Sequence, residues 1–90
     1  MIYTKKIKPP YYQAILDGKK RFEIRNEDDF FPFCGDCLLL REWAEYAGCY
    51  TGRAMIVKIV YIHRGAPLPD GFGVYSIEKL DEIEGLKSES

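Results

Sequence analysis

Residues 18–25 gather more potential chemistry than any other part of the chain. The segment reads Gly-Lys-Lys-Arg-Phe-Glu-Ile-Arg, so four cations and one carboxylate lie within eight positions. Lysine and arginine bind phosphate groups, and an arginine can donate two parallel hydrogen bonds to one anion. The segment therefore indicates a site for a polyanion, with ordinary surface solvation as the competing interpretation.

The distribution of charge along the chain favours the same interpretation. The net charge is −1, yet residues 1–26 carry seven Lys or Arg against two acidic residues, and the remainder carries six against twelve. A local basic region can bind nucleic acid without a basic protein around it, because each cation near a phosphate releases a counterion. Pairing of these cations with Glu27, Asp28 and Asp29 is the alternative that the sequence leaves open.

A short helix is expected immediately before this segment, near residues 10–17. Pro9 and Pro10 suit the first helical turn, and Tyr12, Ile15 and Leu16 follow at helical spacing until Gly18. A glycine is the usual residue just past a helix end. The lysines that follow lie where the helix dipole favours cations, so part of the cluster also has a structural explanation.

The segment itself is predicted to be a strand. Alternation would place Arg21, Glu23 and Arg25 on one face, toward solvent or a cleft, and Phe22 and Ile24 on the other face, in the core.

Four further strands are expected, at residues 1–8, 37–44, 53–63 and 72–78. The strand at 53–63 is apolar on both faces, so it should be central, with Met55, Val57 and Ile59 buried.

Five strands and one early helix in 90 residues predict a single mixed α/β domain that is mainly β, a small partly closed barrel. Residues 1–78 would form this domain, and residues 79–90 an acidic tail that is a weak helix or frayed. The sequence has no apolar run long enough for a bilayer and no apolar leader region. We therefore expect a cytoplasmic monomer without a membrane partner.

Three cysteines and one histidine raise the question of a zinc site. Cys34 and Cys37 have Cys-x-x-Cys spacing, but no second close pair follows, and Cys49 and His63 are isolated. The odd number of cysteines also argues against a disulfide framework. We expect free thiols, no metal and no cofactor.

Several of these residues occur in an order that resembles a known family. Gly18, Lys20, Glu23 and Arg25 match the Gly-x-Lys-x-x-Glu-x-Arg motif of ASCH domains in the PUA-like superfamily. A second landmark follows at Gly35-Asp36 with Leu38, Leu40, Arg41 and Glu42. Residues 15–25, 28–30 and 50–53 are similar to the DUF3850-type group of short, uncharacterised bacterial and phage proteins.

The resemblance implies a PUA-like β-barrel with one main N-terminal helix and a cleft between helix and strands that is a proposed site for RNA. In that interpretation Lys20 and Arg25 hold phosphates, and Glu23 orients Arg25 or accepts hydrogen bonds from a base edge. We expect an RNA- or nucleotide-binding module, with single-stranded DNA as a further possible ligand. Supporting cations would be Arg21, Arg41 and Arg53.

Four aromatic residues are available to stack on an unpaired base, although core packing is their more common role. They are Tyr11, Tyr12, Trp43 and Tyr50.

The alternative is a small hydrolase. Some ASCH proteins that resemble this chain hydrolyse acetylated cytidine with a lysine, a threonine and a carboxylate, and others are described as ribonucleases. Glu23 stands where those hydrolases have threonine, so Lys20 and Glu23 would be the catalytic pair, and Thr51 is the other candidate hydroxyl. Because the expected hydroxyl is missing, we expect a binding module rather than an enzyme.

Overall fold

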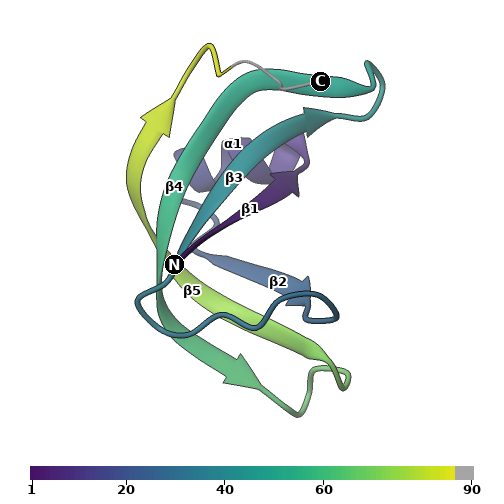
Figure 1. Cartoon of the computed structure of the whole chain (residues 1–90), viewed down its shortest axis with the longest axis vertical. Helices are drawn as coiled ribbons and strands as arrows, with labels where there is room; N and C mark the ends of the chain where they lie inside the picture. The colour runs from purple at the N-terminus through teal and green to yellow at the C-terminus, as the bar shows by residue number, and fades with distance from the viewer. Residues whose placement is uncertain (87–90) are drawn as a thin grey trace.

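The computed structural model describes residues 1–86 and shows a curled five-stranded sheet with one helix against it (Figure 1). The elements are β1 (Ile2–Ile7), α1 (Pro9–Leu16), β2 (Phe22–Asn26), β3 (Cys37–Ala44), β4 (Cys49–Arg64) and β5 (Phe72–Ile83). This confirms the predicted fold class, a mainly β chain compatible with a small partly closed barrel. Within the described residues, no helix is both long and apolar enough to cross a membrane.

The order of the strands places β1 and β2 at the two edges of the sheet. The order is β1-β3-β4-β5-β2, with β1 parallel to β3 and every other pair antiparallel. Register shifts interrupt the β4–β5 pairing twice, and such bulges increase the bend of a strand. The bend in β4 carries the sheet around, so that β2 faces the β1–β3 side (Figure 1).

The core lies inside the curl. Leu38, Met55, Val57 and Ile59 are completely buried, and Tyr12 on α1 packs with them. The predicted burial of the three β4 residues is therefore confirmed. α1 connects the two edge strands, lies behind β1 and β3 in the view of Figure 1, and buries its Tyr12 side against this core.

The predicted orientation of β2 is wrong. Phe22 and Ile24 are 42% and 49% exposed, whereas Glu23 is only 4% exposed. A buried carboxylate is tolerated when charged partners compensate it, and Lys20 and Arg25 both contact this one. Alternation distinguishes the two faces of a strand, but it identifies the inner face only where that face is apolar.

The predicted end of the last strand is also wrong. β5 continues to Ile83, with Lys79 opposite Val57 and Ile83 opposite Ala54 on β4. The helix or frayed tail expected from residue 79 is therefore a strand as far as Ile83, because the long β4 supplies backbone partners along that stretch. Residues 87–90 of the predicted tail lie outside the described residues.

An ion pair fixes the connection between β2 and β3. Glu27 accepts hydrogen bonds from Arg64 Nε at 2.8 Å and from the Tyr75 hydroxyl at 2.5 Å, and Arg64 Nη2 donates to the Pro32 carbonyl at 3.0 Å. Gly73 leaves room for this cluster, since a Cβ there would lie 2.7 Å from Glu27 Oε2. Burial acts to raise the pKa of Glu27, but the bonds from Arg64 and Tyr75 outweigh it, so the pKa is lowered.

Candidate functional site

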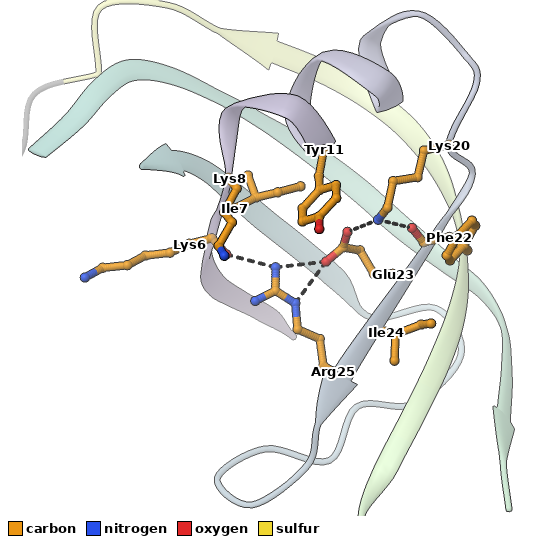
Figure 2. A pocket seen from close by; sticks show the side chains of 9 residues that line it. All are labelled: Lys6, Ile7, Lys8, Tyr11, Lys20, Phe22, Glu23, Ile24 and Arg25. Carbon is orange, nitrogen blue, oxygen red and sulfur yellow. Dashed lines mark hydrogen bonds and ion pairs between the residues drawn. The ribbon is translucent and has the colours of Figure 1, made fainter. Parts of the chain in front are cut away.

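A pocket of about 460 Å³ opens between the end of β1, the start of α1 and strand β2. Figure 2 shows the side chains around it, with the Glu23 carboxylate between Lys20 and Arg25. The pocket combines charged groups with exposed apolar side chains, as ligand pockets commonly do. Its lining consists of Lys6, Ile7, Lys8, Tyr11, Lys20, Phe22, Glu23, Ile24 and Arg25.

The three central residues of the sequence motif come together here. Lys20 Nζ pairs with Glu23 Oε1, and Arg25 Nε donates to Glu23 Oε2 at 2.9 Å. Each carboxylate oxygen therefore has its own cation, which satisfies a side chain that is almost fully buried. Such a three-residue arrangement fixes the direction of both cations relative to the pocket.

The turn after α1 delivers Lys20 to this position. Gly18 has a φ of 74°, a left-handed conformation that favours glycine, and the backbone N–H groups of Lys19 and Lys20 both donate to the Ala14 carbonyl at 3.0 Å. Lys20 Nζ also donates to the Phe22 carbonyl at 2.7 Å. The helix end thus holds Lys20 beside the first residues of β2.

One wall of the pocket is apolar and partly exposed, and the two residues that β2 contributes to it lie on the other side of that strand from Glu23 (Figure 2). Tyr11 from α1 and Phe22 and Ile24 from β2 are each about half exposed, and Tyr11 points into the pocket toward Glu23 (Figure 2). Lys20 Nζ lies 4.8 Å from the Phe22 ring centroid and 5.6 Å from that of Tyr11. Of the predicted stacking residues, Tyr11 lines this pocket, whereas Phe22 was assigned to the core.

Two lysines of the site were missed by sequence reasoning. Lys6 and Lys8 line the pocket from β1 and the residue that precedes α1. Their spacing, two residues apart at the end of a strand, was the available signal for a shared face. With them the pocket has four cations, Lys6, Lys8, Lys20 and Arg25, against the single carboxylate of Glu23.

The three supporting arginines do not line this pocket. Arg21 is exposed, and its Nε donates to the Gly18 carbonyl at 3.2 Å. The Arg41 guanidinium lies 3.9 Å from the Tyr50 ring centroid. Arg53 donates to both oxygens of Glu42, at 3.0 and 2.9 Å. The structure therefore brings together half of the six predicted binding residues.

Glu42 is the second buried carboxylate of the barrel. Hydrogen bonding from Arg53 lowers its pKa against the opposing effect of burial, and the Thr51 hydroxyl adds a bond of 2.7 Å. The Arg53 guanidinium also lies 4.7 Å from the ring centroid of buried Tyr12. Thr51 is thus committed to this cluster and does not line the pocket of Glu23.

The cysteines are spread over the described part of the chain. Cys34 and Cys49 are exposed, and all three thiols are free. Cys37 lies opposite Lys58 and Cys49 opposite Ala44, at the two ends of β3. Residues 1–86 contain no group of three or more His, Cys, Asp or Glu side chains placed to hold a metal ion.

The class of protein follows from comparison with known sequences. Residues 2–77 match the family described as "Domain of unknown function (DUF3850)", and the chain belongs to this family. It is also similar to the "Uncharacterized 12.9 kDa protein in GpA 3'region" of Escherichia phage P2. The two are 38% identical over 58 residues, which cover 64% of this chain and 50% of the phage protein. The chain thus matches about half the length of that relative.

Proposed function

We propose that this chain is an RNA- or nucleotide-binding module of the ASCH type within the PUA-like superfamily. One observation carries the proposal: four cationic residues and partly exposed aromatic rings line a single pocket together with one buried carboxylate. The Gly18-to-Arg25 motif supports the ASCH assignment, because its lysine, glutamate and arginine are the residues that meet in this pocket.

The charges of the pocket divide between holding the site together and attracting a ligand. Glu23 neutralises one positive charge, so the four cations leave a formal excess of three. Lys8 is exposed and lines the pocket without pairing to Glu23. Lys6 is exposed and lines it from β1, but its side chain points away from Glu23 (Figure 2), and its ammonium lies 3.8 Å from the Trp43 ring centroid. Lys6 and Lys8 are the side chains best suited to phosphate, while Lys20 and Arg25, fixed by Glu23, define the polar end of the pocket.

The apolar wall suits the base of a nucleotide. Tyr11 and Phe22 present partly exposed rings beside the cations, and unpaired bases stack on such rings with little dependence on sequence. The Glu23 oxygens are hydrogen-bond acceptors within the same pocket, which matches the exocyclic amino groups of bases. A phosphate, a base face and a base edge can therefore be recognised together.

The hydrolase alternative has less support. Lys20 and Glu23 are adjacent, as that alternative requires, but the Lys20 amine already donates to Glu23 and to the Phe22 carbonyl. Thr51 hydrogen bonds to Glu42 outside the pocket. A nucleophile oriented by a free base is therefore missing from this arrangement. Release of acetate from acetylated cytidine, abolished by Lys20→Ala in a folded protein, would favour the hydrolase instead.

A binding titration at several salt concentrations tests the proposal. We expect a nucleoside monophosphate and short RNA to bind, and Lys8→Ala to reduce the slope of log affinity against log salt by about one. Lys20→Ala should weaken binding as well, with folding checked by circular dichroism. Lys58→Ala is the matched control, because Lys58 is an exposed lysine on β4 that does not line the pocket. Absence of binding at low salt, or equal losses for all three variants, would refute the proposal.

A further inference from the structure

A second hollow adjoins the pocket of Glu23. It has a volume of about 290 Å³, and Trp43 and Glu45 from β3 and its following turn form one side of it. The other side consists of Lys6, Ile7 and Lys8, the residues that also line the first pocket. The two hollows therefore lie on either side of the same short segment and share its two lysines.

Aromatic rings and cations alternate beyond this second hollow. Trp43 and Tyr50 face each other across the β3–β4 pair, with ring centroids 4.9 Å apart in an edge-to-face contact. Lys6 Nζ lies 3.8 Å from the Trp43 centroid, and the Arg41 guanidinium lies 3.9 Å from the Tyr50 centroid. Both rings are partly exposed, so this group belongs to the surface rather than to the core.

We propose that the two hollows form one track for a single-stranded nucleic acid of several nucleotides. One base would occupy the Glu23 pocket against Tyr11, a neighbouring base would stack on Trp43, and the phosphates between them would meet Lys6 and Lys8. This inference rests on the proposed nucleotide-binding function and extends it, because it names an oligomeric ligand and a second base site.

Lys6 would exchange partners when the ligand binds. A cation over an exposed ring is held more weakly than a base stacked on the same ring, so a base can take the place of the Lys6 ammonium on Trp43. The displaced ammonium then becomes available to a phosphate, which compensates for the contact it gives up. Glu45 opposes this only weakly, since it is exposed and its charge is screened by salt.

The fluorescence of Trp43 tests the track directly, because it is the single tryptophan of the sequence. We expect a saturating single-stranded tetranucleotide, either RNA or DNA, to quench this fluorescence and to bind more tightly than a nucleoside monophosphate. The monophosphate, whose binding is followed by calorimetry, should leave the fluorescence nearly unchanged. A blunt-ended duplex should bind more weakly than the single strand, because its bases are already stacked.

Variants separate stacking from general attraction. Trp43→Leu should weaken tetranucleotide binding about tenfold and leave monophosphate binding unchanged. Trp43→Phe, which retains a ring, should recover part of the loss. Tyr61→Leu is the matched control, because Tyr61 is an aromatic residue of β4 that is 63% exposed and lines neither hollow. It should leave both affinities unchanged.

The inference and the proposed function fail in different ways. If Lys20→Ala weakens nucleotide binding but the tetranucleotide neither gains affinity nor quenches Trp43, the track is refuted and the Glu23 pocket stands. Tighter binding of duplex than of single strand would also refute the track. If neither monophosphate nor tetranucleotide binds the wild-type protein, the proposed function and the track are refuted together.

Discussion

Arg25 on β2 donates a hydrogen bond from its Nη2 to the backbone carbonyl of Lys6 on β1, at 2.9 Å. These two strands are the edges of the sheet and share no ladder, so a side chain spans the gap where a closed barrel would have paired strands. The same guanidinium donates to Glu23. Arg25 therefore joins the two edges and organises the pocket between them (Figure 2).

This double role predicts that Arg25→Ala lowers the free energy of unfolding by about 1–3 kcal/mol, because the buried Glu23 loses one of its two charged partners. Arg25→Lys should cost less, since it retains the charge but not the planar geometry that reaches both Glu23 and Lys6. Urea unfolding measures both. Exposed Arg21, whose Nε donates to the nearby Gly18 carbonyl, provides the control, and Arg21→Ala should change stability little. Equal stability of the Arg25→Ala and wild-type proteins would contradict this role.

Much of this fold is predictable from local patterns. The Gly35-Asp36 turn before β3, the two apolar faces of β4 and the Pro-Pro start of α1 are signals within a few residues of one another. The inward direction of Glu23 does not follow from the alternation of β2 alone. It depends on Lys20 and Arg25 compensating the charge, and Lys20 is placed by the turn at the helix end.

The same reason explains the lysines that were missed. Lys6 is distant in sequence from Arg25, and the two meet only because the sheet curls until β1 and β2 face each other. The motif at residues 18–25 therefore indicates part of the site from sequence alone. The residues that β1 contributes to the site can be identified only when the order of the strands is known.

Glu27 predicts how stability depends on acid. Its pKa is lowered in the folded protein from an ordinary value of 4.5. Near that pH the folded state therefore binds fewer protons than the unfolded state. The contribution of Glu27 is complete above about pH 4.5 and disappears as the pH falls through the folded pKa. We expect the urea concentration at the unfolding midpoint to decrease as the pH drops below about 4.5. Glu27→Gln should be less stable at neutral pH and show a shallower fall. Glu42 and Asp36 account for the remaining slope, because the pKa of each is also lowered.

If the acid dependence of the Glu27→Gln protein matched that of wild type, the hydrogen bonds of Glu27 would not be the cause. Exposed Asp28→Asn is the control from the same loop. It should change neither the midpoint at neutral pH nor the slope in acid.

Tyr75 predicts how the stability of the fold depends on pH in alkaline solution. Burial, followed by the hydrogen bond to Glu27, raises the pKa of Tyr75 well above its ordinary value of 10.0. A raised pKa means that the folded state retains a proton that the unfolded state loses, so this contribution is complete below about pH 10 and is lost above it. Tyr75→Phe should lower the free energy of unfolding by about 1 kcal/mol at neutral pH, for the lost hydrogen bond. It should also weaken the fall in stability above about pH 10, which titration of the urea midpoint would show. An unchanged alkaline slope would contradict the assignment.

The stability of a Phe22 variant distinguishes the observed orientation of β2 from the opposite orientation. With Phe22 lining the edge of the pocket from the side of β2 opposite Glu23 and 42% exposed, Phe22→Ala should cost less than about 1.5 kcal/mol of stability but weaken nucleotide binding, because the apolar wall loses a ring. Met55→Ala, at a completely buried position, is the control and should cost about 2–5 kcal/mol. If Phe22→Ala cost as much stability as Met55→Ala, the Phe22 ring would have to lie in the core. The orientation of β2 would then be the reverse of the one described. Glu23 would then point outward, away from the cations that define the site, so a single unfolding measurement tests both the orientation of β2 and the pocket built on it.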